Sequence, residues 1–338
     1  MRILIIGPSW VGDAVIAQSL YKQIKKNYPD SSLDVLATSW TISLVKRMKE
    51  VSEVILFPFN HGEIAIRKRL SFGKNLSSRN YDWSIVLPNS LKSSIIPLAS
   101  KVSKRTGWLG ELRFFFLNDF KKLNSVDHPL LVQRYCALAN NFEPVGQDFM
   151  YPALEVDKNN LMSLCNKFHI SNFDKPLILC PGAEFGPAKR WPPDNYAEVG
   201  KYFLGKNNKV IVLGSVKDTE VCSEIEKNIS TKGDANFINL CGKTSLEDAI
   251  DILSMGIVLS NDSGLMHIAA AVGSPQIALY GPTDPNFTPP LNKKAKVIRK
   301  VSGYRKIRAT KSKDGFDSSL KDISTEEVIE CVEALLMN

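Results

Sequence analysis

The turn after the first apolar run of the chain carries a carboxylate placed where it could do acid–base chemistry. Gly7-Pro8 ends the run Arg2–Ile6, and Asp13 stands where apolar residues begin to recur at helical spacing. A carboxylate at this point could act as a general base that takes a proton from an incoming hydroxyl. It could equally cap the helix. The residues alone leave both interpretations open.

This turn does not match the known nucleotide-binding patterns. The dinucleotide fingerprint requires a glycine where Ser9 stands, and an acid at the end of the second strand, where the chain has 37–39 as Ala-Thr-Ser. The phosphate-binding loop requires lysine and then serine or threonine where Asp13 and Ala14 stand. We therefore expect any phosphate to bind elsewhere in the chain.

A second loop, residues 181–192, has the composition of a phosphate cradle. It follows an apolar run at 176–180, two glycines and three prolines shape its backbone, and Lys189-Arg190 supplies two cations just before a predicted helix. Backbone N–H groups of such a loop can hold phosphate while a lysine adds charge. The alternative is a structured loop with solvated cations, and Trp191 reads as a packing residue.

A third loop, residues 260–267, again joins a strand to a helix. Asp262 or Ser263 can cap that helix, Gly264 allows a ligand close to the first N–H groups, and His267 follows one turn later. A Ser-His-Asp hydrolase lacks support, because no G-x-S-x-G elbow is present and Ser263 and His267 share one helix. A plain cap beside a buried histidine is the simpler alternative. Loop 280–288 is also shaped by Gly and Pro and should border the same sheet edge. Two anion-binding loops at that edge suggest a pyrophosphate bound between them.

The elements that must hold these loops form two series of alternating strands and helices. Apolar runs at 2–6, 33–37, 54–57 and 85–87, and again at 176–180, 209–213, 237–240, 257–260 and 276–279, alternate with amphipathic stretches. Such alternation predicts parallel sheets in two doubly wound α/β domains with a cleft between them. We expect an N-terminal domain over 1–155, a C-terminal domain over 156–323, and a final helix, 324–338, that could pack back on the N-terminal domain.

Composition limits the class of protein. With 338 residues, 44% hydrophobic and 23% charged, the chain is neither disordered, collagen-like nor coiled-coil. A net charge of +8 suits an anionic partner. The six cysteines form no CxxC pair and read as buried thiols of a reducing compartment. No run approaches the ~18 apolar residues of a membrane span, so a cytoplasmic location is expected.

Taken together, the segments GPSWVGD, VLPNSLKS, RTGW, PGAEFGPAKRWP, NDSGLMHIAAA and YGPTDPNFTPP resemble the ADP-heptose:lipopolysaccharide heptosyltransferases of glycosyltransferase family 9. The resemblance runs from Met1 to about Leu336 and is strongest to the heptosyltransferase II branch. It implies a GT-B fold, two Rossmann-like domains facing across a cleft, with the acceptor bound by the first and the donor by the second. It also implies inverting transfer of L-glycero-D-manno-heptose from ADP-heptose to the lipopolysaccharide inner core, with no metal or cofactor required.

The resemblance also assigns roles to individual residues. The family's base matches Asp13, and its phosphate-binding lysine matches Lys189. Its donor-phosphate loop matches Asp262, Ser263, Gly264 and His267. Its ribose-binding acid corresponds to Glu220 or Asp218, and the sequence does not decide between them.

The acceptor expected from this branch is Kdo-lipid A that already carries one heptose. Alternatives are heptosyltransferase I, a family member with another acceptor, a nucleotide-sugar epimerase of the same architecture, and a non-catalytic sugar-nucleotide-binding protein. Basic residues beside the aromatic run 114–117 suggest peripheral contact with the anionic cytoplasmic face of the inner membrane. These residues are Arg67, Lys68, Arg69, Lys101, Lys104, Arg105 and Arg113. Nucleic acid is not an expected partner, because the basic residues are scattered and no binding motif accompanies them.

Overall fold

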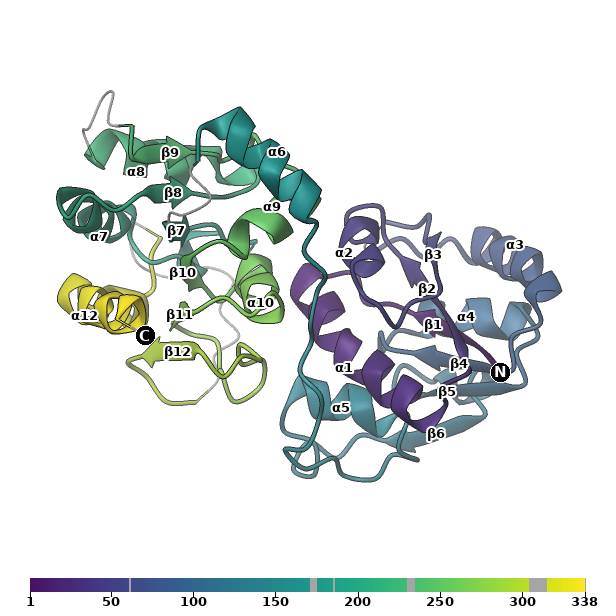
Figure 1. Cartoon of the computed structure of the whole chain (residues 1–338). Coiled ribbons are helices and arrows are strands. Elements are labelled where there is room, and N and C mark those ends of the chain that lie inside the picture. Colours follow the sequence, from purple (N-terminus) through teal and green to yellow (C-terminus); the bar gives the residue numbers. More distant parts are fainter. Residues whose placement is uncertain (61, 171–174, 185, 230–234, 304–314, 338) are drawn as a thin grey trace. The chain divides into compact units, whose positions relative to one another are not determined.

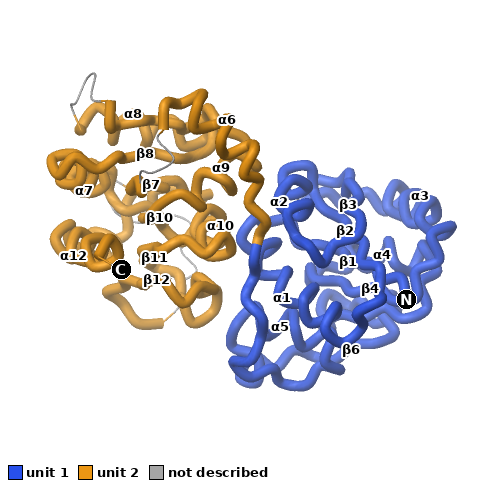
Figure 2. Tube along the Cα trace, in the orientation of Figure 1, with its two compact units in different colours: residues 1–153 blue, residues 154–338 orange. Residues whose placement is uncertain are grey.

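The computed structural model describes the chain except residues 61, 171–174, 185, 230–234, 304–314 and 338. It divides into two compact units, Met1–Ala153 and Leu154–Asn338, each with its own parallel sheet (Figure 2). The boundary between the units lies between Ala153 and Leu154.

Unit 1 is a doubly wound sheet in which every strand pair is parallel. The strands follow the order β3-β2-β1-β4-β5-β6. Helices α1, α2 and α5 lie on one face, and α3 and α4 lie together on the other (Figure 1). Its elements are β1 Arg2–Ile6, α1 Val11–Asn27, β2 Ser32–Ala37, α2 Ile42–Lys46, β3 Glu53–Leu56, α3 Ile66–Leu76, β4 Trp83–Val86, α4 Leu91–Ala99, β5 Lys104–Leu109, β6 Asp119–Lys122 and α5 Leu131–Ala137.

Unit 2 repeats this plan with the strand order β12-β11-β10-β7-β8-β9. Helices α7, α8 and α12 form one layer, and α6, α9 and α10 the other (Figure 1). Its elements are α6 Lys158–Phe168, β7 Leu177–Cys180, α7 Pro193–Gly205, β8 Val210–Val212, α8 Thr219–Ile229, β9 Phe237–Asn239, α9 Leu246–Leu253, β10 Ile257–Asn261, α10 Gly264–Ala271, β11 Gln276–Tyr280, β12 Ala295–Arg299, α11 Ser318–Lys321 and α12 Thr325–Leu336.

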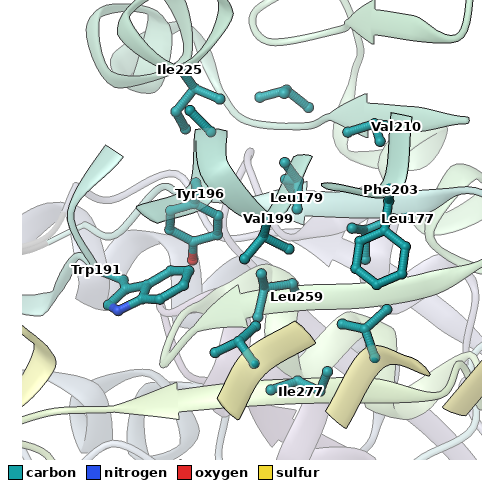
Figure 3. Close-up of a cluster of buried hydrophobic side chains, with 14 of the residues drawn as sticks. Leu177, Leu179, Trp191, Tyr196, Val199, Phe203, Val210, Ile225, Leu259 and Ile277 are labelled. Carbon is teal, nitrogen blue, oxygen red and sulfur yellow. The ribbon is translucent and has the colours of Figure 1, made fainter. Parts of the chain in front are cut away.

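The core of unit 2 lies between the sheet and α7. Figure 3 shows Val199 of α7 between Leu179 and Leu259 of the sheet, with Phe203 of the same helix to one side. Trp191 is fully buried, meets Tyr196 edge-on, and donates from its indole N–H to the carbonyl of residue 323 at 3.1 Å. The prediction that Trp191 is a packing residue is therefore confirmed.

The C-terminal helix α12 contributes to the core of unit 2. Its apolar residues Val328 and Val332 are fully buried in the core of unit 2, where α12 contacts α7, β10 and β11. These valines are four residues apart and so share one helix face. That face is therefore used within unit 2, and packing of this helix on the N-terminal domain stays a prediction.

Other sequence expectations can be compared with the described residues. Five of the six cysteines are buried and Cys331 is partly buried, all as free thiols, which confirms them as small apolar residues. Across the part of the chain that the structure describes, no helix is both long and apolar enough to cross a bilayer.

Candidate active site

Both sheets have a point at which the order of strands reverses, and the loops singled out from the sequence gather there. In unit 2 the reversal lies between β7 and β10, which are adjacent and parallel. Loop 181–192 follows β7 and loop 262–264 follows β10, so both leave the same sheet edge. Ligands of doubly wound sheets bind in the crevice beyond the carboxyl ends of such a pair of strands.

Lys189 and Asp262 meet across these two loops. The Lys189 Nζ lies 2.9 Å from the Asp262 Oδ2, and their side chains are only 16% and 11% exposed. Lys189 ends a short 3₁₀ turn, Pro187–Lys189, that begins after Gly186. Gly186 has a φ of +74°, a conformation glycine adopts without strain. The loop thus holds the lysine close to the start of α10.

The start of α10 is capped by Ser263. Its Oγ accepts from the Met266 N–H at 3.5 Å, and Gly264 is the first helical residue. The remaining N–H groups of this turn carry the positive end of the helix dipole. Lys189 therefore adds a full positive charge where the backbone already favours an anion.

His267 lies one turn into α10 and is 6% exposed. The pKa of His267 is lowered to about 4, chiefly by burial; the Asp262 charge opposes this shift and the Lys189 charge adds to it. The imidazole is therefore neutral near pH 7. It then keeps one N–H donor and cannot contribute a charge.

Asp218, a candidate ribose-binding acid, is engaged in holding the loops. It accepts from the Arg190 guanidinium at 3.1 Å and from the Ser215 hydroxyl at 2.7 Å. A Cβ on Gly182 would come within 2.6 Å of its carboxylate, so a larger residue there would displace Asp218 from this position. Glu220, the other candidate, is exposed in the first turn of α8. Both acids follow β8, at the same sheet edge as Lys189.

Asn261 is a residue of this site that sequence reasoning missed. It is fully buried at the end of β10. Its Nδ2 donates to the Pro181 carbonyl at 2.8 Å, and its Oδ1 accepts from the backbone N–H of Trp191 at 3.0 Å. One amide thus fixes both ends of loop 181–191. Its signal in the sequence was a polar residue at the end of a strand that begins with three apolar residues.

We predict that Asn261→Ala lowers the free energy of unfolding by about 1–3 kcal/mol, because a buried donor and a buried acceptor lose their partner. Urea unfolding followed by circular dichroism measures this. Asn159→Ala, an exposed position on α6, is the control and should change the free energy by less than about 0.5 kcal/mol. Equal effects of the two changes would contradict the role assigned to Asn261.

The loop after β11 closes the same edge of unit 2. Arg299 approaches the Asp284 carboxylate at 3.4 Å, and the Tyr280 hydroxyl donates to the Thr288 carbonyl at 2.7 Å. These bonds shape loop 281–288 next to the loop that carries Asp262, because β11 and β10 are neighbours. The sequence prediction that this loop borders the same edge is confirmed.

In unit 1 the strand order reverses between β1 and β4, and Asp13 follows β1. The residue capping α1 is Trp10, and Asp13 is the third helical residue, half-buried in the first turn. The pKa of the buried Tyr135 in α5 is raised chiefly by burial and further by the Asp13 charge. Asp13 therefore lies close enough to Tyr135 for the two side chains to interact electrostatically across the α1–α5 contact.

Two arginines expected on a membrane-facing surface are instead buried. Arg113 donates to the Trp108 and Pro88 carbonyls and to the Asn89 side chain, which fixes the turn after β4. Arg69 donates to two backbone carbonyls and lies over the Phe59 ring. This corrects the sequence expectation. Burying a guanidinium costs less when its N–H groups donate inside the protein. Arg113 donates from all three of its nitrogens, and Arg69 from Nε and Nη2, while its buried Nη1 has no partner.

Comparison with known proteins adds to this geometry. The model of glycosyltransferase family 9 (heptosyltransferase) matches residues 69–316. The chain is 43% identical to lipopolysaccharide heptosyltransferase 2 of Escherichia coli K12, over 100% of this chain and 99% of that protein. It is 44% identical to lipooligosaccharide heptosyltransferase 2 of Haemophilus influenzae, over 99% of each. The chain belongs to glycosyltransferase family 9.

Solved structures agree with this membership. The structure of E. coli ADP-heptose LPS heptosyltransferase II matches with a TM-score of 0.88 and 41% identity, over 100% of this chain and 99% of that one. A family 9 glycosyltransferase from Veillonella parvula has the same fold, with a TM-score of 0.85 at 20% identity. The chain described here is thus a glycosyltransferase with a GT-B-like fold of two Rossmann-like units.

The structure brings several of the predicted site residues together. Lys189 and Asp262 are in contact, and Ser263, Gly264 and His267 lie in the same turn of α10. The structure does not choose between Asp218 and Glu220. Among the described residues, no group of three or more His, Cys, Asp or Glu side chains could hold a metal ion.

Proposed function

We propose that this enzyme transfers L-glycero-D-manno-heptose from ADP-heptose to the first heptose of the lipopolysaccharide inner core, with inversion at the anomeric carbon. The observation that carries the proposal is Lys189 beside the start of α10, at the strand reversal of a family 9 transferase. Relatives with the same family membership and full-length similarity are named heptosyltransferase 2.

The donor chemistry follows from charge. As the glycosidic bond breaks, negative charge grows on the departing diphosphate. Lys189 and the N–H groups at Ser263-Gly264 stabilise that charge, and the neutral His267 donates one hydrogen bond to it. Asp262 orients the lysine through their 2.9 Å contact. The ribose is held by Asp218 or Glu220, and we expect neither a metal nor another cofactor to be required.

The acceptor chemistry needs a base on the opposite face of the sugar. Inverting transfer is an in-line displacement, so the attacking hydroxyl and the leaving diphosphate must lie on opposite sides of the anomeric carbon. Asp13, at the strand reversal of unit 1, takes the hydroxyl proton as the new bond forms. In this mechanism residues 1–155 bind the acceptor and residues 156–323 bind the donor.

The experiment that tests the function is mass spectrometry of the product. ADP-heptose is supplied with Kdo-lipid A and, separately, with Kdo-lipid A that carries one heptose. We expect one added heptose on the second acceptor alone. Addition to the first would assign the enzyme to heptosyltransferase I chemistry, and donor turnover without either acceptor would favour an epimerase.

We also propose peripheral binding to the anionic cytoplasmic face of the inner membrane through residues 112–115. Leu112 and Phe115 are 75% and 77% exposed, and Phe114 is 42% exposed. The acceptor is a lipid, and exposed aromatic residues enter the bilayer interface readily. Arg67, Lys68, Lys101 and Lys104 are exposed basic residues of the same unit and could add attraction to anionic headgroups.

Phe115→Ser should reduce liposome binding by at least about tenfold, since burying a phenylalanine contributes about 1.5–3 kcal/mol. Flotation with vesicles containing anionic lipid measures the bound fraction. Val126→Ser, at a position 83% exposed, serves as the control. Binding that is indifferent to Phe115, to salt and to lipid charge would contradict this surface.

A further inference from the structure

Two of the five tryptophans are exposed, and both lie at the carboxyl edge of the sheet in unit 1. Trp10 is 39% exposed and Trp40 is 42% exposed. Trp83, Trp108 and Trp191 are 4% exposed or less. Single exposed apolar residues are common on protein surfaces, whereas neighbouring exposed apolar residues often mark a binding surface. Two partly exposed indoles in adjacent loops belong to the second case.

The strand register brings the two tryptophan loops together. Strands β1 and β2 are parallel neighbours in which Ile6 pairs with Leu36, and Trp10 and Trp40 follow this pair by the same number of residues. The Trp40 indole N–H donates to the Ser9 carbonyl at 2.7 Å, which ties one loop to the other. Figure 1 shows β1 and β2 side by side at this edge.

Both loops are held rigidly. The Thr38 and Thr41 hydroxyls lie 2.9 Å apart, both buried, and the Thr41 N–H donates to the Thr38 carbonyl at 2.9 Å. Trp10 caps α1 in an extended conformation, three residues before Asp13. Because the indole N–H of Trp40 already donates to the Ser9 carbonyl, the exposed part of this side chain is apolar ring, tied to the loop that leads into the helix of the proposed base Asp13.

We propose that Trp10 and Trp40 form a stacking subsite for a pyranose ring of the acceptor. One face of a pyranose presents C–H groups, which pack on an indole, while its hydroxyls stay in water at the rim. Indoles offer large, rigid, apolar area at little entropic cost. The subsite rests on the proposed function, since it places the sugar whose hydroxyl Asp13 deprotonates.

The test uses the full-length enzyme and a lipid-free acceptor, the mono-heptosylated core oligosaccharide without acyl chains, so that membrane binding plays no part. Trp10→Leu and Trp40→Leu should each raise the acceptor KM about tenfold, equal to about 1.4 kcal/mol. The donor KM should not change. Trp40→Phe should restore most of the acceptor affinity. Tyr28→Leu, an aromatic 44% exposed at the other end of α1, is the control and should change neither KM.

Fluorescence gives a readout that needs no turnover. Iodide reaches exposed indoles, so quenching of the wild-type enzyme should come from Trp10 and Trp40, and the oligosaccharide should protect them. Lack of protection, or unchanged acceptor KM in both leucine variants, would overturn the subsite while leaving the transferase function standing. Protection in an enzyme that transfers heptose to no acceptor would support the subsite and overturn the proposed function.

Discussion

Asp13→Asn is expected to lower turnover by at least ~10²-fold, the low end for loss of a general base. The amide keeps the shape of the side chain but cannot accept the proton of the attacking hydroxyl. Affinity for ADP-heptose should stay near the wild-type value, because Asp13 belongs to unit 1 and the proposed donor groups belong to unit 2. Steady-state kinetics with a saturating acceptor and calorimetric titration of the donor measure the two effects.

The size of the effect separates catalysis from helix stability. A carboxylate in the first turn of a helix contributes about 0.3–1 kcal/mol through the helix dipole, whereas a ~10²-fold loss of rate corresponds to about 2.7 kcal/mol. Asp30→Asn, at an exposed position beyond the other end of α1, is the control. Near-normal turnover of the Asp13 variant would remove Asp13 from the role of base and leave it a helix-stabilising acid.

Much of the fold could be predicted because buried parallel strands are continuous apolar runs. Strands β1, β7 and β10 were recognised in this way. The loops that follow them carry the candidate site residues Asp13, Lys189 and Asp262. The strands that escaped detection are β6 and β12, at sheet edges, and β5 beside β6. Their sequences, DFKK, AKVIR and KRTGWL, mix charges with apolar residues. A strand with a solvated edge or end needs no continuous apolar run, so the apolar pattern that identifies buried strands is weak in its sequence.

The site was predictable as a set of loops but not as a set of contacts. The Gly/Pro-shaped turns after strands indicated which segments would line the crevice. Strand order is not written in the sequence, so the meeting of Lys189 with Asp262 could not be derived from it. The same is true of Asn261 and Arg113, whose partners lie far away along the chain. The resemblance to family 9 supplied the roles.

Lys189→Met is expected to reduce kcat/KM by about 10²–10³-fold, the range found when one preorganised donor to a developing anion is removed. Methionine keeps the length and apolar stem of the side chain but has no charge. The loss should appear in donor affinity and in turnover, because the diphosphate is charged before reaction and gains charge during it. Lys217→Met is the control. Its ammonium pairs with Glu184 at 2.9 Å on the surface, 75% exposed, and contributes little.

The contact with Asp262 requires a second variant before this result can be assigned to catalysis. Removing the lysine leaves a carboxylate that is 11% exposed without that partner, so the single variant could lose activity through a distorted loop. Asp262→Asn combined with Lys189→Met removes both charges and relieves that penalty. If the lysine stabilises the leaving diphosphate, the double variant regains thermal stability and stays inactive. If the double variant regains activity, the lysine serves only to neutralise Asp262, and the departing charge must be carried by the N–H groups of α10.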